Sequence, residues 1–134
     1  MEDLRSSMDL ELKSVVVPQL RLAGFKGSLP HFRRVTDGQI DLLTFQFDRN
    51  GGGFLIEISR CALVGTTTPW GKAIGPKAVT AWDMHPDRRY RLKPSEGNGV
   101  DSWFRFDSNS ISVCSEQVLQ SLSKAEQWWR DCDV

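Results

Sequence analysis

The 134-residue chain is long enough for one domain with a sizeable core, and its 40% hydrophobic and 25% charged residues are typical of a globular rather than a disordered protein. Its 17 basic and 17 acidic residues cancel, which argues against an overall attraction to nucleic acid or an anionic membrane. No apolar run approaches the roughly 20 residues that span a bilayer, and the acidic N-terminal segment lacks the apolar core of a signal peptide, so we expect a single cytoplasmic domain over residues 1–134.

An N-terminal helix is predicted over residues 6–22. Ser6 is followed three residues later by Asp9, which resembles the capping box that satisfies backbone donors at a helix start. Apolar residues then recur at the spacing that places them on one inward face: Leu12, Val15, Val16 and Leu20.

Pro18 interrupts this helical pattern. Proline lacks a backbone N–H and clashes with the preceding turn, so we expect a kink or a restart near Val17. Gly24 is suited to the C-terminal end of the helix. We expect Phe25 to pack onto that end, and residues 26–30 to be a connector.

Three strands joined by two turns are expected at the centre of the fold. The Asp-Gly pair at 37–38 and the Asp-Arg-Asn-Gly-Gly-Gly cluster at 48–53 favour chain reversal, because glycine and asparagine adopt positive φ at little cost. Around them, aromatic and aliphatic residues alternate with polar ones, as in strands with one buried face. We place these strands at 31–36, 39–48 and 53–64.

The alternation selects one register for each hairpin, because a shift by one residue would turn the apolar set away from the core. The expected pairs on the core face are Phe47 with Phe54, Phe45 with Ile56, Leu43 with Ile58, and Phe32 with Leu43.

The same registers align three charged residues at one end of the core face. Arg34 lies opposite Asp41, and Asp41 lies opposite Arg60. We interpret this row as an ion-paired border of the core. A ligand-binding role for these residues is the alternative interpretation.

Residues 65–88 show no clean period. So long a connection in a compact domain is usually functional or mobile. It contains Trp70 and Trp82, which either plug the edge of the core, the more frequent outcome, or remain outside as binding anchors.

The remaining chain predicts short strands and a final helix. Strands are expected at 89–92 and 102–107, separated by a polar loop at 93–100, and a weaker strand signal covers 111–113. We expect a helix capped by Ser115 and ending near Arg130. Its apolar seam is Val118, Leu122, Ala125 and Trp129, widened by Leu119 and Trp128. The predicted fold is α+β, an antiparallel β-meander with the N- and C-terminal helices packed on one face.

Nucleophilic catalysis is not supported by the sequence. His31 and His85 are the only histidines, and neither is accompanied by a nucleophile motif. Cys61 is expected opposite Ile40 as a packed thiol. With Cys114 and Cys132 it makes an odd number of cysteines at wide spacing, which favours free thiols.

Other binding chemistries are equally weakly indicated. Asp83 and His85 could supply only two metal ligands, so we expect no metal and no cofactor. The glycines at 51–53 lack the Lys-Ser/Thr of a phosphate loop. The basic cluster at 88–93 surrounds Tyr90 and could stack bases, but the zero net charge and the missing RNA-binding signature argue against nucleic acid.

Several short motifs, in order, resemble the DUF4304 family of small, mostly bacterial domains. They are Gly24-Phe25-Lys26 after the helix, Phe32 with Arg34, Gln46 among apolar residues, and Trp103-Phe104. This chain departs from the family pattern in having Phe104 where a second Trp is common, and residues 65–88 have no counterpart. The resemblance would cover roughly residues 10–130, and it implies no reaction and no cofactor. Small bacterial domains of this build sometimes serve as immunity proteins, a step that rests on analogy.

We therefore expect a non-enzymatic module of the bacterial cytosol that binds a protein partner. Trp70 and Trp82 would be the anchors if residues 65–88 form the binding surface. The polar face of the sheet is the other candidate surface, and its members are Thr44, Gln46 and Glu57, joined by Leu55, Trp103 and Arg105.

Two alternatives remain. One is an enzyme or small-ligand protein with a pocket between residues 65–88 and the sheet, whose polar groups would be Arg34, Asp41, Arg60, Asp83 and His85. The other is self-association through an edge strand.

Overall fold

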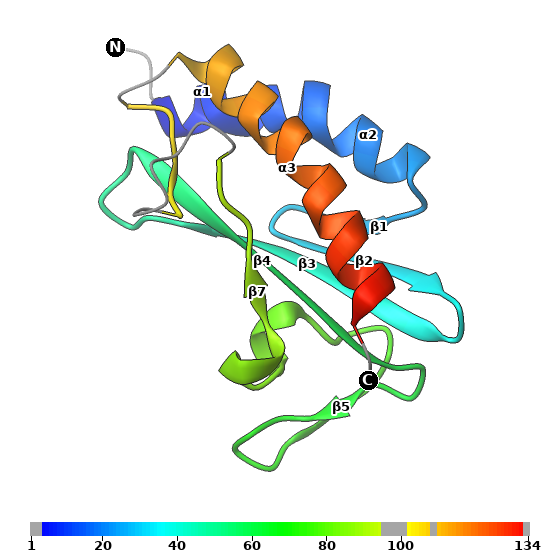
Figure 1. Ribbon diagram of the computed structural model, residues 1–134. Coiled ribbons are helices and arrows are strands. Elements are labelled where there is room, and N and C mark those ends of the chain that lie inside the picture. Colours follow the sequence, from blue (N-terminus) through cyan, green and yellow to red (C-terminus); the bar gives the residue numbers. More distant parts are fainter. Residues whose placement is uncertain (1–3, 95–101, 108–109, 133–134) are drawn as a thin grey trace.

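The structure, a computed structural model, describes residues 4–94, 102–107 and 110–132. Its main sheet is antiparallel, with the strand order β1-β2-β3-β4-β7, and β8 also pairs with β4. The elements are α1 (Leu4–Glu11), η1 (Leu12–Val16), α2 (Val17–Leu22), β1 (Lys26–Ser28), β2 (His31–Thr36), β3 (Gln39–Phe47), β4 (Gly53–Ala62), β5 (Thr66–Thr67), β6 (Ala73–Ile74), η2 (Ala81–Asp83), η3 (Pro86–Arg88), β7 (Tyr90–Arg91), β8 (Phe104–Arg105) and α3 (Ile111–Asp131). Figure 1 shows α1, α2 and α3 on one side of this sheet and the β5–β6 hairpin on the other, which confirms the predicted α+β fold. Within the described ranges, no helix has the length and apolar character needed to cross a membrane.

Pro18 is accommodated by a change of helix type. η1 is a π-helical segment, whose Leu12 carbonyl accepts from the Val17 N–H, and α2 begins at Val17 with the proline in its first turn. The predicted restart near Val17 is therefore confirmed. The described helix already includes Leu4, ahead of the predicted start. Its buried stripe consists of Met8, Leu12, Val16 and Leu20. Val15, predicted to face inward, is only partly buried, because the wider π turn aligns residues four apart.

The helix ends as its glycine predicts. Gly24 has φ +99°, and the Phe25 N–H donates to the Leu20 carbonyl at 2.9 Å, a bond typical of a left-handed helix cap. Phe25 is buried against Trp129, with ring centroids 5.2 Å apart. Residues 26–28 are not a plain connector, however. They form β1, which pairs with β2, and its exposed side chains give no apolar pattern that could have revealed it.

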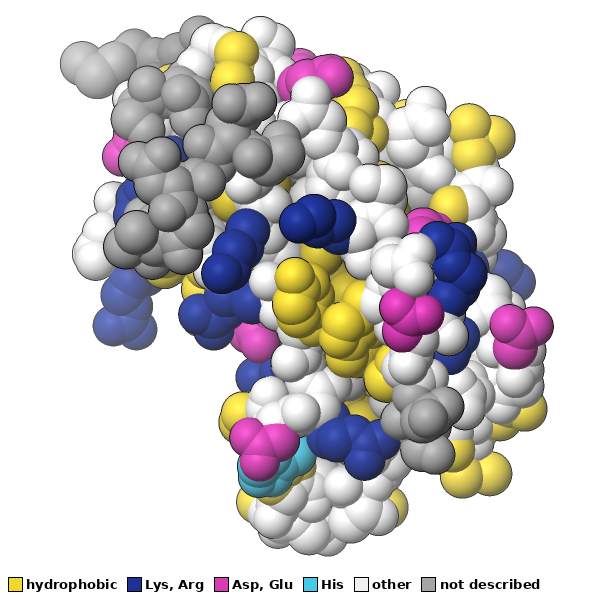
Figure 2. Space-filling view, in the orientation of Figure 1, with side chains coloured by type: hydrophobic (Ala, Val, Ile, Leu, Met, Phe, Trp, Pro, Cys, Tyr) yellow, Lys and Arg dark blue, Asp and Glu magenta, His cyan; other side chains and the backbone are white. Residues whose placement is uncertain are grey.

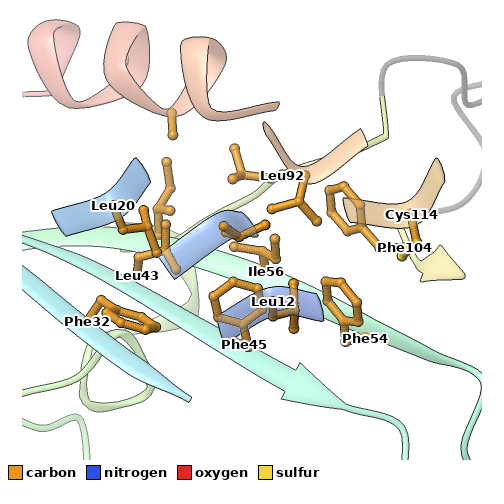
Figure 3. Packing of buried hydrophobic residues seen from close by; sticks show 14 of the residues in the cluster. Leu12, Leu20, Phe32, Leu43, Phe45, Phe54, Ile56, Leu92, Phe104 and Cys114 are labelled. Carbon is orange, nitrogen blue, oxygen red and sulfur yellow. The ribbon is translucent and has the colours of Figure 1, made fainter. Parts of the chain in front are cut away.

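Both predicted hairpin registers are confirmed. Phe45 pairs with Ile56 and Phe47 with Phe54 across β3 and β4, and Phe32 pairs with Leu43 across β2 and β3. Figure 3 shows Leu12 and Leu20 of the N-terminal helix lying over the ring side chains that the strands supply. A run of ring contacts continues to β8, where Phe54 and Phe104 stack at 5.5 Å. The core therefore lies between the sheet and the helices.

The other face of the sheet is covered in part by residues 66–88. A second apolar cluster forms there from Ile40, Leu42, Cys61, Val79, Ala81 and Met84. The polar face that was predicted to be open is largely closed. Thr44, Leu55 and Glu57 are buried, and the Thr44 hydroxyl accepts a hydrogen bond from the Ala81 N–H at 3.3 Å. Gln46 remains exposed.

The C-terminal region differs from prediction at the start of its helix. α3 begins at Ile111, and the Ser110 hydroxyl accepts a hydrogen bond from the Val113 N–H at 3.2 Å. The predicted strand at 111–113 and the predicted cap at Ser115 are therefore wrong. The β-branched residues of this segment suggested a strand, but the helix keeps Cys114 in the buried seam. Ser115 is buried and donates to Glu11 at 2.7 Å. β7 and β8 lie inside the predicted strands but are shorter.

Truncating one core ring tests this architecture. We expect Phe45→Ala to lower the free energy of unfolding by about 3–5 kcal/mol, because it removes the ring that joins β3 to Phe32 and Phe54. Urea denaturation measures the change. The neighbouring exposed residue supplies the control, since Gln46→Ala should shift stability by no more than about 0.5 kcal/mol. Equal effects of the two changes would contradict the assignment of faces.

Candidate functional site

The predicted charged row exists and is buried. The Asp41 side chain has no exposed surface. Its Oδ2 lies 2.9 Å from Arg34 Nη2, and its Oδ1 accepts a hydrogen bond from Arg60 Nε at 2.8 Å. The Thr36 hydroxyl donates to the same carboxylate at 2.7 Å. Two guanidinium groups and one hydroxyl thus satisfy a carboxylate that has lost its water.

The row also connects the sheet to α3. Glu126 accepts two hydrogen bonds from Arg34, at 2.9 and 2.7 Å, in the bidentate geometry that suits a guanidinium. Arg60 donates to the Trp129 carbonyl at 2.6 Å, one of the last carbonyls of the helix. Burial disfavours the charged form of Arg34, but its hydrogen bonds to Glu126 and Asp41 outweigh that effect and raise its pKa.

Sequence reasoning missed Glu126, because the residue is 92 positions from Arg34. A signal was present, since Glu126 falls at helical spacing within the apolar seam between Leu122 and Trp129. Arg34 also lies over the rings of Phe25 and Trp129, at 4.4 and 5.1 Å from their centroids. Arg34 and Arg60 therefore have their donors engaged inside the domain, as an ion-paired border of the core requires.

Trp82 and Asp83 lie on η2, beside the sheet. Asp83 accepts a hydrogen bond from the Thr80 N–H at 2.8 Å, which fixes the start of η2. The Trp82 ring contacts His31 edge to face, with centroids 5.0 Å apart, and is 39% exposed. His31 Nδ1 lies 3.1 Å from the Thr44 hydroxyl. Burial lowers the pKa of His31, and the positive charge of Arg33 lowers it further. Asp83 opposes these effects but does not cancel them, so the lowered pKa favours a neutral imidazole.

A cleft of about 380 Å³ opens next to these residues, along β3. Arg5 and Lys13 of the N-terminal helix line one side of it, and Trp82 lines the other. Phe47, at the end of β3, also lines it, and the Arg5 guanidinium lies 3.6 Å from the Phe47 ring centroid. The cleft therefore combines cationic and aromatic walls.

A second cleft, of about 360 Å³, lies between the end of β4, the β5–β6 hairpin and η3. His85 and Arg88 line it. His85 is held as the cap of η3, because its Nδ1 accepts a hydrogen bond from the Asp87 N–H at 3.1 Å. The other polar groups expected in a pocket at this position do not line this cleft: Asp83 caps η2, and Arg34, Asp41 and Arg60 lie on the helix side of the sheet.

Trp70 lies at the turn of the β5–β6 hairpin and is 65% exposed. Leu63 and Val64, just before the hairpin, are exposed as well. Trp70 and Trp82 are therefore both exposed. The more frequent outcome, in which such residues plug the edge of the core, does not apply to either of them. Trp103 and Gln46 lie elsewhere: Arg105 stacks over Trp103 at 5.6 Å, and Gln46 pairs with Leu55 in the sheet.

The basic cluster near β7 is partly neutralised. Arg89 and Arg91 approach Glu57 at 3.6 and 3.7 Å, and Tyr90 stacks on Trp128 with centroids 6.1 Å apart. Figure 2 shows cationic side chains around an apolar group in the middle of this face, with acidic groups interspersed. Across the described ranges, no group of three or more His, Cys, Asp and Glu side chains is arranged to hold a metal ion.

Two thiols are expected to be unreactive. Burial raises the pKa of Cys61 to about 11 and that of Cys114 to about 12. The thiolate is the nucleophile, and at these pKa values less than about 1% of either cysteine is in the thiolate form at pH 8. We expect both to resist a disulfide reagent at pH 8 in the native protein and to react fully in denaturant, as measured by peptide mapping. Native labelling of Cys61 at the denatured rate would contradict its packing.

The buried ion pairs give a second prediction. Asp41→Ala should lower the free energy of unfolding by about 3–5 kcal/mol, because it leaves Arg60 buried beside Arg34 without their shared carboxylate. Thermal denaturation measures this. Asp9→Ala is the matched control, since the exposed Asp9–Arg5 pair should contribute less than about 1 kcal/mol. A loss of similar size in both variants would count against the network.

Comparison with known proteins identifies a family. Neither a curated protein nor a solved structure matches the chain. The family described as "Domain of unknown function (DUF4304)" matches residues 16–131, which include α2, the whole sheet and α3. The suspected resemblance is thus confirmed, and the chain belongs to the DUF4304 family.

Proposed function

We propose that this DUF4304 domain is a protein-binding module whose main anchor is Trp70. We define the arm as residues 62–74, which include the β5–β6 hairpin. The observation that carries the proposal is the 65% exposure of Trp70 at the turn of this arm, with Leu63 and Val64 exposed at its base. Large apolar side chains that gather on a projecting element are typical of interaction sites, and tryptophan is among the residues that most often dominate binding energy.

The arm holds Trp70 in a defined position. The Thr68 N–H donates to the Lys72 carbonyl at 2.8 Å, and the Gly71 N–H donates to the Thr68 carbonyl at 2.9 Å. The Thr68 hydroxyl accepts a third bond from the Lys72 N–H, and Thr68 is itself buried. A turn fixed by three hydrogen bonds loses less conformational entropy when a partner covers it, which supports its use as a preorganised contact.

The arm is also joined firmly to the sheet. Gly65 has φ +98°, and a side chain at this position would collide with the Ile74 carbonyl. The Gly65 N–H donates to the Ala62 carbonyl at 2.9 Å, directly after β4. Figure 1 shows the hairpin projecting away from the helices, so a partner could cover it without contacting the core. We place this binding in the cytoplasm, where the buried Cys61 would stay reduced, and an immunity-like role is one form that it would take.

A capture experiment with a matched variant tests the proposal. Wild type, Trp70→Ala and Leu22→Ala are immobilised at equal density and exposed to an extract of the source organism, and retained proteins are quantified by mass spectrometry. Leu22 is an exposed apolar residue at the end of α2, and Figure 1 shows this helix on the opposite side of the sheet from the hairpin. We expect a protein that wild type and Leu22→Ala retain equally and that Trp70→Ala retains at least about tenfold less.

The same protein, purified, should bind wild type in calorimetry with the same dependence on Trp70. Because Trp70 is largely exposed, its replacement should leave the unfolding temperature unchanged, which separates lost binding from lost folding. Retention that is equal for wild type and Trp70→Ala, for every protein captured, would refute the role of the arm.

A further inference from the structure

An uncovered strand edge lies in the cleft along β3. β2 begins at His31, opposite Thr44, and the last bond across this pair runs from the Phe45 N–H to the Pro30 carbonyl at 2.8 Å. β3 continues to Phe47, three residues beyond the residue that lies opposite the first residue of β2. Because hydrogen-bonding direction alternates along a strand, the N–H and C=O of Phe47 point to the same side as those of Phe45. Within the described ranges, no strand pairs with Phe47 on that side.

Pro30 leaves the neighbouring position incomplete. Its carbonyl accepts the bond from Phe45, but proline has no N–H to return to the Phe45 carbonyl. Pro30 therefore ends the pairing at Phe45, and the edge beyond it offers the donor and the acceptor of Phe47. These are the groups that an added extended segment would satisfy, as in peptide recognition by strand addition.

The cleft has suitable dimensions and walls for such a segment. Its volume of about 380 Å³ lies within the range of roughly 300–1,000 Å³ found for ligand sites. Trp82 forms one wall. Its position is fixed by two contacts, since Arg89 donates to its carbonyl at 2.8 Å and His31 contacts its ring. An exposed indole on a fixed element offers a flat apolar contact to a side chain of the added segment.

The opposite wall favours a negative charge. Arg5 and Lys13 contribute two positive charges there, and Asp9, which pairs with Arg5 at 3.3 Å, contributes one negative charge. Counted over the described residues that line it, the wall keeps one net positive charge. A carboxylate on the added segment would complement it, whereas a lysine at the same place would be repelled.

We propose that the cleft between α1, β3 and η2 binds an extended, acidic segment of a protein partner, which pairs with the backbone of β3 at Phe47. Trp82 supplies the apolar contact, and Lys13 attracts the carboxylate. The inference goes beyond the proposed function by adding a second site, and it rests on that function only in assigning a protein partner. The site does not include Trp70.

Titration followed by backbone amide NMR tests the site with a defined probe, the peptide Ac-Thr-Glu-Val-Glu-Val-Thr-NH2. We expect saturable shifts centred on the amides of Phe45, Gln46 and Phe47, with a dissociation constant of about 1 mM or lower. Two changed peptides serve as controls. One has lysine in place of glutamate, and the other has every internal amide N-methylated. Both should bind at least about tenfold more weakly.

Protein variants assign the walls. Trp82→Ala and, independently, Lys13→Glu should each weaken binding of the acidic peptide about tenfold, while Lys13→Glu, a surface change, should leave the fold intact. Trp70→Ala should leave peptide binding unchanged, so the result for this site is independent of the result for the arm. Absence of saturable shifts at Phe47, or equal binding of the acidic, lysine and N-methylated peptides, would overturn the proposal. Binding that ignores both Lys13→Glu and Trp82→Ala would do so as well.

Discussion

The burial of one carboxylate, that of Asp41, constrains the arrangement of the whole domain. A charge without water is costly unless opposite charges and hydrogen bonds replace the lost solvent. Arg34 and Arg60 supply those charges from the two flanking strands, so the registers of both hairpins must hold together for the row to form. The same guanidinium groups reach Glu126 and the end of α3. The angle at which the helix crosses the sheet is therefore set by polar contacts as well as by the apolar core.

This constraint also decides which surfaces remain for binding. The helix side of the sheet is closed by the core and by the charged row. Residues 66–88 close most of the opposite side around Thr44 and Cys61. What remains is peripheral: the projecting arm with Trp70, and the end of β3 beside Trp82. The binding role that we propose therefore falls on the rim of the sheet and not on either face.

The centre of the fold was predictable, because two local signals agreed. Turn chemistry at 37–38 and 48–53 fixed where the chain reverses, and the alternation around Phe45 and Ile56 fixed the register, so the row through Asp41 followed. Elements that form without a periodic pattern were not predictable. β1 has exposed polar residues and is held by backbone pairing, and the β-branched start of α3 resembled a strand.

The candidate site was only partly predictable for a related reason. The sequence identified Trp70 and Trp82 as residues that needed an explanation, but it gave no period over residues 65–88 from which to derive their exposure. The closure of the polar face depends on the same irregular segment. Glu126 was missed because its partner Arg34 is 92 residues away, and its place in the apolar seam of the helix did not by itself identify that partner. The free edge of β3 results from a difference in length, since β3 has nine residues and β2 has six.

The arm consists of positions that are needed for its fold and of positions that only face solvent. Gly65 has no room for a side chain, and Thr68 is buried, whereas Pro69, Trp70 and Lys72 face solvent. The exposed positions at the apex of the arm can therefore change in this chain with little penalty in folding. Under the proposed function, substitutions at these positions would alter which partner is bound without disturbing the core of the domain.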